Sequence, residues 1–83
     1  RVEAALRASG EFLDVAVIGL PDAEWGEVVV ACYPPAAREP NFVRAAVELA
    51  AHERPKRFVP VANWPRNAQG KVNRAALRAS IQR

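Results

Sequence analysis

Two apolar runs, separated by a short polar segment, constrain the fold of this chain more than any other feature. The first run reads FLDVAVIGL at residues 12–20, and the second reads VVVACY at residues 28–33. Both are short and rich in β-branched residues, so each predicts a strand. The segment between them, PDAEWGE, contains Gly26, a permissive turn residue. We therefore expect an antiparallel pair of strands, the first of them buried on both faces.

Two further segments have the spacing of amphipathic helices. The first covers residues 2–9 and is stopped by Gly10, and the second covers residues 42–52 behind the N-cap residue Asn41. In both segments apolar residues recur three and four positions apart, so they fall on one helical face. One helix is therefore expected before the paired strands and another after them.

The last third of the chain predicts one more strand and one more helix. RFVPVA at residues 57–62 reads as a strand, which Pro60 restricts to a sheet edge or a bulge. Asn73 can cap a final helix, and Val72 and Leu77 have the spacing of a hydrophobic staple. The predicted fold class is α+β, a small three-stranded sheet with flanking helices in the order helix, strand, strand, helix, strand, helix.

Composition fits one small globular domain. The chain has 83 residues, 51% of them hydrophobic, and no apolar run approaches the length of a membrane span. A single cysteine excludes an internal disulfide and favours a reducing, cytoplasmic setting. The expected core consists of Val15, Val17, Ile18, Val29, Ala31, Val47, Leu49, Phe58, Val61 and Leu77.

Few residues could carry chemistry without a partner domain. One histidine, His52, and one cysteine cannot form a Cys/His metal cluster, so no metal site is expected in this chain. The pair Gly70-Lys71 lacks two features of a phosphate-binding loop, a glycine five residues earlier and a following Ser or Thr. No self-contained active site is predicted.

Lys71 nevertheless stands out from the other cations. The chain contains 12 Lys and Arg residues, and only Lys56 and Lys71 are lysines. Lys71 follows a glycine, between a polar turn and the last predicted helix. Two interpretations are open: a solvated loop lysine, or a compact ammonium held on a turn where it can reach a phosphate or carboxylate.

Trp25 and a group of cations are the other candidates. A basic face that keeps the domain soluble is the simpler explanation of the cations, and the net charge of +3 favours anionic partners only weakly. Trp25 stands beside a glycine in a turn, where it could equally cap the core or stack on a base or a partner. The cations in question are Arg54, Lys56, Arg57, Arg66, Lys71 and Arg74.

Two stretches resemble the C-terminal domain of the adenylate-forming enzymes, namely acyl- and aryl-CoA synthetases, luciferases and nonribosomal adenylation domains. They read VAVIGLPDAEWGEVVVACY and RPKRFVPVANWPRNAQGKVNRAAL. The second is the more specific, because Pro-Arg-Asn, Gly-Lys-Val, Arg and Leu keep the family's spacing. NWP replaces the family's usual Leu-Pro, a change expected to alter packing only. The resemblance implies that residues 1–83 are the C-terminal lid domain of a larger AMP-forming acid–CoA ligase, whose N-terminal domain lies outside this chain.

The family's reaction implies a catalytic role for Lys71. Such enzymes join a carboxylate to ATP, forming an acyl-adenylate and pyrophosphate, and a thiol then attacks the adenylate after the lid has reoriented. The lysine at this position contacts the carboxylate and the α-phosphate side of the nucleotide in the first step. Its charge offsets the repulsion between two anions as they react.

Aryl-CoA ligases such as 4-chlorobenzoate–CoA ligase extend the resemblance to CoA. By that likeness Trp25 stacks on the CoA adenine, Arg54 and Lys56 meet the CoA phosphates, and His52 takes the place of a stacking aromatic residue. ATP and CoA are the implied substrates, together with a small carboxylic acid, for which an aryl acid such as o-succinylbenzoate is suggested. Mg²⁺ is expected in the full-length enzyme but not on this domain.

Two alternatives remain open. The domain could belong to an adenylation enzyme that loads a carrier protein, which has no need of Trp25 and Arg54 for a CoA nucleotide. It could instead be a small basic nucleic-acid-binding module, which requires a basic stripe with several exposed aromatic residues. On the leading interpretation the isolated domain is monomeric and inactive, its partner is its own N-terminal domain, and neither nucleic acid nor membrane is bound.

Overall fold

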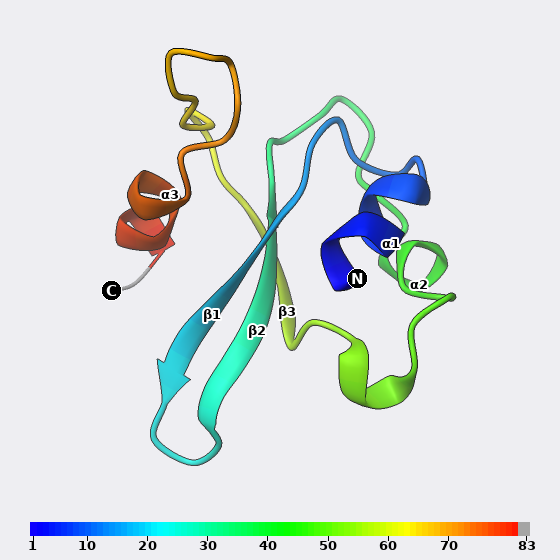
Figure 1. The fold of residues 1–83 in the computed structure, drawn as a ribbon. Helices are drawn as coiled ribbons and strands as arrows, with labels where there is room; N and C mark the ends of the chain where they lie inside the picture. Colours follow the sequence, from blue (N-terminus) through cyan, green and yellow to red (C-terminus); the bar gives the residue numbers. More distant parts are fainter. Residues whose placement is uncertain (82–83) are drawn as a thin grey trace.

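A computed structural model describes residues 1–81 of the chain, and it has the predicted α+β order. Three α-helices flank one three-stranded sheet (Figure 1), and a short 3-10 helix, η1, precedes the last strand. In chain order the elements are α1 (Val2–Ala8), β1 (Ala16–Asp22), β2 (Gly26–Tyr33), α2 (Phe42–Ala45), η1 (Ala51–Glu53), β3 (Arg57–Pro60) and α3 (Arg74–Ile81).

The sheet is mixed, with β2 in its centre. β1 and β2 form the predicted antiparallel pair, in which Ala16 lies opposite Cys32 and Asp22 opposite Gly26. β3 lies beside β2 and runs parallel to it, from the pair Val30 and Arg57 onward. The prediction that Pro60 restricts its strand to an edge is confirmed, because β3 pairs on one side only and Pro60 ends it.

Both faces of the sheet are covered, and β1 is buried on the face that carries Ala16, Ile18 and Leu20 and half-buried on the other. α3 lies over one face, and α1 and α2 lie over the other (Figure 1). The α3 face buries Ala16, Ile18, Leu20, Val30, Cys32, Val61 and Leu77. The opposite face buries Leu6, Val15, Ala31, Ala45, Ala46 and Leu49. A small domain thus divides its apolar residues between two thin cores on either side of one sheet.

Aromatic side chains join the connecting segments to the α1 and α2 face. Phe42 and Phe58 stack with ring centroids 4.6 Å apart, and Phe12 stacks on Phe58 at 6.2 Å. Tyr33 packs at a tilt against both Phe12 and Phe42. With Trp64, which packs against the other core, five of the six aromatic residues are used in packing, and Trp25 is the one aromatic residue of the described chain that is classed as exposed.

The helix predicted over residues 42–52 is wrong in length. Asn41 caps it as expected, since its side chain accepts a hydrogen bond from the Arg44 N–H at 3.0 Å, but α2 ends at Ala45. In a continuous helix the Ala50 N–H would bond to the carbonyl of residue 46. It instead donates to the Glu53 carboxylate at 3.0 Å, which stabilises the separate helix η1. The Glu53 carboxylate thus takes the place of the helical carbonyl acceptor for the Ala50 N–H.

Two expected core residues are also wrong. Val29 is 36% exposed and Val47 is 66% exposed. The core cluster under α1 and α2 covers Ala31 but does not include Val29. Val29 lies two residues closer to the β1–β2 turn. Val47 belongs to the segment that was expected to continue α2, and the early end of α2 takes it out of the predicted apolar row.

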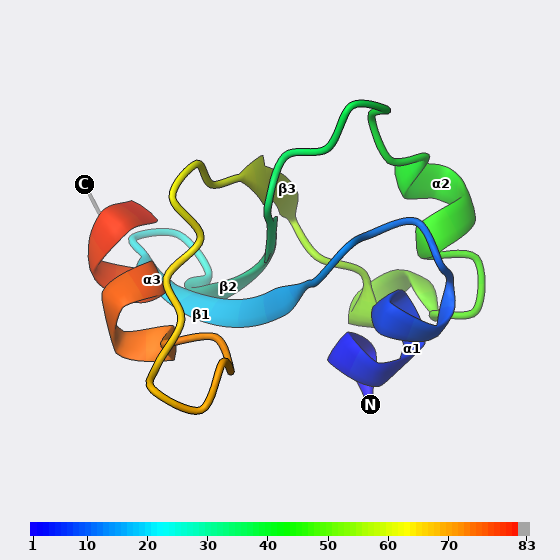
Figure 2. The ribbon, with the colours of Figure 1, turned by 90° about the horizontal axis from the view of Figure 1, so that it is seen from above.

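The segment between β3 and α3 crosses from one edge of the sheet to the other. Figure 2 shows it running from β3 past β1 to the start of α3. Asn73 caps α3 as predicted, because its side chain accepts a hydrogen bond from the Ala76 N–H at 3.1 Å. Val72 packs against the core cluster that contains Leu77, in agreement with the predicted staple. Lys71 therefore stands directly before a well-defined helix start.

Candidate functional site

Lys71 lies on a short hairpin whose backbone is closed by several hydrogen bonds. Arg66 and Val72 face each other across an antiparallel bridge, and the Asn67 N–H donates to the Lys71 carbonyl at 2.7 Å. The Asn67 side-chain oxygen accepts from the N–H groups of both Gln69 and Lys71, at 2.9 and 3.1 Å. We call residues 65–73 the Lys71 hairpin. Its shape follows from the sequence NAQG, in which asparagine starts a turn that a glycine completes.

Gly70 provides the conformation that this turn requires. Its φ angle is +82°, in the left-handed region that side chains other than glycine rarely adopt. The Gly70 N–H donates to the Asn67 carbonyl at 3.0 Å, so the four residues form a closed β-turn. The glycine before the lysine is thus explained by the turn itself, and the turn presents Lys71 next to the start of α3.

The cations around the Lys71 hairpin differ in their partners. Lys71 is exposed and makes no ion pair within residues 1–81. Arg74 instead holds Glu3 through two charge-assisted hydrogen bonds of 2.6 and 2.9 Å. Arg66 lies 3.7 Å from Asp14. Near the hairpin the two arginines therefore pair with acids, whereas the Lys71 ammonium makes no ion pair among residues 1–81. The interpretation of the cations as a basic face that keeps the domain soluble stays a prediction.

Burial and hydrogen bonding act in opposite directions on the two acids. Burial alone would raise the pKa of Glu3, but hydrogen bonds from Arg74, the Val17 N–H and Arg7 outweigh it and lower that pKa. The pKa of Asp14 is lowered in the same way. Both carboxylates are therefore charged at neutral pH and bind their arginines as anions.

Trp25 lies at the far end of the β1–β2 pair, in the turn that joins the two strands. The Asp22 carboxylate accepts hydrogen bonds from the N–H groups of Glu24 and Trp25, both at 2.9 Å, and these bonds lower the pKa of Asp22. The Trp25 side chain is 65% exposed, so the interpretation as a core cap is wrong. Its indole is available for stacking.

Lys56 is brought to Trp25 by the fold. The Lys56 ammonium lies 5.3 Å from the centroid of a Trp25 ring, a cation–π contact between residues 31 positions apart. The Lys56 N–H donates to the Val29 carbonyl at 2.7 Å, which fixes its backbone to β2. A hollow of about 480 Å³ beside this pair is lined in part by Asp22, Lys56 and Arg57. An aromatic face and cations thus share one exposed surface.

His52 and Arg54 precede Lys56 in the chain. His52 belongs to η1, Arg54 follows it, and both are exposed. The Arg54 Nε donates to the Leu49 carbonyl at 3.1 Å, which leaves its terminal nitrogens available. Among residues 1–81 no hydrogen bond or cation–π contact joins either residue to Trp25. The structure therefore connects Lys56 to Trp25 directly and connects the other two only through the chain.

Sequence reasoning missed the acids that hold the Lys71 hairpin. Asp14 interrupts the apolar run FLDVAVIGL, and a single charge within such a run was a signal that it has a buried partner. The expectation that Trp64 changes packing only is also wrong, since its Nε1–H donates to Asp14 at 3.1 Å. Glu3 gave no comparable signal, because an acid in the first turn of a helix is common.

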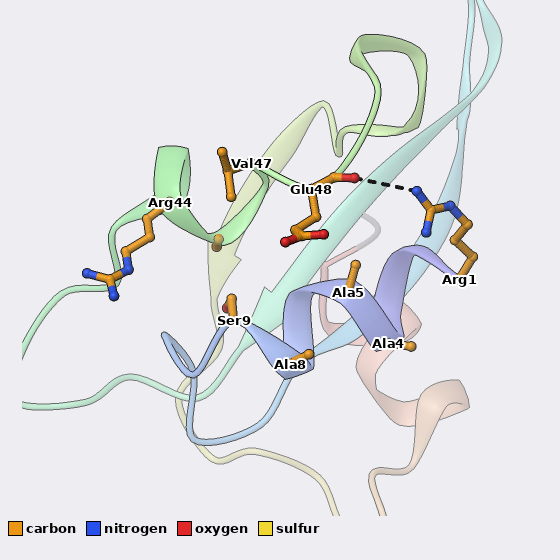
Figure 3. A pocket seen from close by; sticks show the side chains of 9 residues that line it. Arg1, Ala4, Ala5, Ala8, Ser9, Arg44, Val47 and Glu48 are labelled. Carbon is orange, nitrogen blue, oxygen red and sulfur yellow. Dashed lines mark hydrogen bonds between the residues drawn. The ribbon is translucent and has the colours of Figure 1, made fainter.

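A separate hollow lies between α1 and α2. It measures about 640 Å³ and is lined by small residues of both helices, with Arg1, Arg44 and Glu48 at its rim (Figure 3). The Arg1 guanidinium contacts the Glu48 carbonyl at 3.5 Å and the Glu53 carboxylate at 2.9 Å. Neither Lys71 nor Trp25 lines this hollow.

Two classes of site are not found in the part of the chain that the structure describes. Residues 1–81 contain no group of three or more His, Cys, Asp or Glu side chains placed to hold a metal ion. Among the same residues no helix is both long and apolar enough to cross a membrane.

Comparison with known proteins agrees with this geometry. The chain matches the model of the AMP-binding enzyme C-terminal domain over residues 1–71, which ends at Lys71 itself. It is 41% identical to 4-chlorobenzoate–CoA ligase of Arthrobacter sp. over 81 residues, covering 93% of this chain and 16% of that protein. It is 36% identical to long-chain-fatty-acid–CoA ligase FadD13 of Mycobacterium tuberculosis over 69 residues, covering 78% of this chain and 14% of that protein.

Solved structures give the same result. A fatty acyl CoA synthetase of Mycobacterium tuberculosis superimposes with a TM-score of 0.81 at 30% identity, covering 96% of this chain and 17% of that chain. The present chain thus spans about a sixth of the length of the relatives it matches. The chain belongs to the AMP-binding enzyme C-terminal domain family.

Proposed function

We propose that this domain is the mobile lid of an ATP-dependent, AMP-forming acid–CoA ligase, and that it supplies the adenylation lysine and part of the CoA-binding surface. The observation that supports this most is the state of Lys71: an exposed ammonium, without an ion pair in residues 1–81, on a turn that hydrogen bonds and two acids hold in place. Its partner is an N-terminal domain that carries the ATP and acid sites, since the ligases matched are about six times longer.

The proposed first step needs a cation at this position. The acid's carboxylate oxygen attacks the α-phosphorus of ATP, the bond to the β-phosphate side breaks, and pyrophosphate leaves. Lys71 offsets the repulsion between carboxylate and phosphate as negative charge builds on the α-phosphoryl oxygens. Mg²⁺ is proposed to accompany ATP on the N-terminal domain.

The second step uses another face of the domain. The CoA thiol loses its proton and attacks the acyl carbon of the adenylate, and AMP leaves as the thioester forms. Trp25 is proposed to stack on the CoA adenine, and Lys56 and Arg54 to bind its phosphates. His52 is proposed as a weaker stacking partner at the edge of the same surface. The exposure of Trp25 and the approach of Lys56 to its ring support this assignment.

The acid is proposed to be an aryl carboxylic acid. The support is the match to 4-chlorobenzoate–CoA ligase over 93% of the chain, and o-succinylbenzoate is one candidate within this class. The long-chain-fatty-acid–CoA ligase FadD13 matches almost as well. A panel that contains 4-chlorobenzoate, o-succinylbenzoate and a long-chain fatty acid therefore belongs in the first assay of the full-length protein.

The two half-reactions test the proposal when they are measured separately. In the full-length enzyme, Lys71→Ala should lower acid-dependent pyrophosphate exchange by about 10²–10³, the usual cost of removing one charge-stabilising donor. Thioester formation from preformed acyl-adenylate and CoA should stay close to the wild-type rate. Ala68→Ser is the control on the same turn, because residue 68 is exposed and its side chain takes no part in the hydrogen bonds by which Asn67 holds the turn.

Equal losses in both half-reactions would mean that Lys71 has a structural role. A normal second half-reaction with a phosphopantetheinyl carrier protein, together with no thioester formed on free CoA, would instead favour the carrier-loading alternative.

A further inference from the structure

The Asp14 carboxylate contacts four different residues, although it lies in a loop. Its Oδ1 accepts from the Arg7 Nη1 at 2.6 Å and from the Val15 N–H at 2.8 Å. Its Oδ2 accepts from the Trp64 Nε1 at 3.1 Å and lies 3.7 Å from the Arg66 Nη1. Its side chain is only 14% exposed. One carboxylate therefore joins α1 to a segment 50 residues further along the chain.

Both distant partners lead directly to Lys71. Trp64 comes immediately before the Lys71 hairpin, and Arg66 is on the strand of the hairpin that faces Val72. The same Arg66 Nη1 also donates to the Gly70 carbonyl at 3.1 Å, one residue before Lys71. Asp14 thus contacts a guanidinium that itself holds the backbone of the catalytic turn.

The internal bonds of the hairpin and its outer contacts have different consequences. Asn67 and Gly70 close the turn without Asp14, so the turn should keep its shape when Asp14 is changed. What Asp14 determines is where the hairpin lies against β1 and α1. At the other end, Glu3 holds Arg74, and Arg7 bridges Glu3 to Asp14.

We propose that Asp14 is a positioning residue for adenylation, acting through Trp64 and Arg66 to fix the Lys71 hairpin relative to the sheet. The proposal rests on the function proposed above for Lys71. Lys71 makes no ion pair of its own in residues 1–81, so within this domain the hairpin backbone is what determines where the residue is placed. A misplacement of about 1 Å at a reacting centre can cost about 10² in rate.

Two conservative variants of the full-length enzyme test it. Asp14→Asn keeps the size of the side chain and an oxygen acceptor but loses the charge that binds Arg7 and Arg66. Trp64→Phe keeps an aromatic ring for packing and removes the donor together with part of the side-chain volume. Arg1→Gln is the matched control, because it breaks an α1 ion pair, that with Glu53, on the other side of the domain.

Three quantities are measured for each variant: pyrophosphate exchange, thioester formation from preformed adenylate, and hydrogen–deuterium exchange of peptides that cover residues 64–73. We expect Asp14→Asn to lower kcat for pyrophosphate exchange about 10-fold or more with little change in KM for ATP. Trp64→Phe should give a smaller loss in the same direction. Both should speed deuterium exchange in the hairpin and spare the second half-reaction, and Arg1→Gln should change none of the three.

The double variant shows whether Asp14 acts through Trp64. If it does, Asp14→Asn and Trp64→Phe together should cost less in kcat than the product of their separate effects. Unchanged hairpin deuterium exchange, or normal pyrophosphate exchange, in Asp14→Asn would overturn the positioning role. Normal pyrophosphate exchange in Lys71→Ala would contradict the proposed function, and this separate result keeps the two failures distinguishable.

Discussion

The Lys71 hairpin and the Trp25 turn are both exposed tips of the same small sheet domain, yet they are held differently. Acids from the N-terminal part of the chain hold the Lys71 hairpin at both ends, through Arg74 and Arg66. The Trp25 turn is closed by the Asp22 carboxylate, and the Lys56 ammonium makes a cation–π contact with the Trp25 ring. A cation that must meet a reacting phosphate needs a fixed position, whereas a stacking surface tolerates adjustment.

This contrast also separates two uses of positive charge. Arg66 and Arg74 pair with Asp14 and Glu3, while the side chain of each arginine stays about half exposed. Lys56 and Lys71 have no acidic partner within residues 1–81. The contrast applies to the cations around the Lys71 hairpin, because Arg54, Arg57 and Arg78 also make no ion pair among the described residues.

The largest effect expected at the Trp25 turn is on the affinity for CoA. Base–aromatic stacking contributes about 1–3 kcal/mol, so Trp25→Ala should raise the KM for CoA by roughly 5- to 100-fold in the full-length enzyme. Pyrophosphate exchange should not change. With pantetheine, which lacks the adenine, the difference between variant and wild type should largely vanish.

Leu13→Ala is the control for this effect, because Leu13 is 77% exposed and Trp25 is 65% exposed. Its KM for CoA should equal that of the wild type. A normal KM for CoA in Trp25→Ala as well would contradict the proposed role of Trp25 in CoA binding. It would not affect the proposed role of Lys71 in adenylation.

A medium effect is expected on the stability of the fold at acidic pH, where Glu3 and Asp14 lose their charge. The pKa values of Glu3 and Asp14 are lower in the folded protein, so the unfolded chain takes up protons first as the pH falls. The stability that they contribute should be complete above about pH 5 and decrease below about pH 4. Denaturant unfolding at several pH values measures this, and Glu3→Gln should flatten the dependence while Glu24→Gln should not.

The smallest effect is expected for Asp14→Asn on the reactivity of Cys32, which lies in the core under α3, away from both tips. Burial raises the pKa of its thiol to about 11, and the side chain is fully buried. At pH 8 only about one thiol in 10³ is then the reactive thiolate. Alkylation of the native protein should therefore be very slow, and Asp14→Asn should leave it slow. Rapid labelling in that variant would show that Asp14 supports the whole core and not the hairpin alone.

Local signals in the sequence predicted the elements on which both tips depend. The turn glycines Gly26 and Gly70 have φ angles of +80° and +82°, as their position between polar turn residues indicates. The caps Asn41 and Asn73 act within three residues of themselves, so their role could be read from neighbouring positions.

Features that depend on distant contacts could not be predicted in the same way. The early end of α2 at Ala45 could not be predicted either, because the apolar spacing of residues 42–52 is that of a regular helix. The exposure of Val29 depends on which end of the sheet the helices cover. The link from Asp14 to Trp64 spans 50 residues, and periodicity contains no information on it.

The central claim is that the two tips serve different half-reactions. The measurement that tests it most directly is a comparison of the Lys71→Ala, Trp25→Ala and double variants of the full-length enzyme, with each half-reaction followed separately. The double variant should lose pyrophosphate exchange only as much as Lys71→Ala does, and CoA affinity in thioester formation only as much as Trp25→Ala does. Losses in the double variant that greatly exceed those of the single variants in either half-reaction would contradict it.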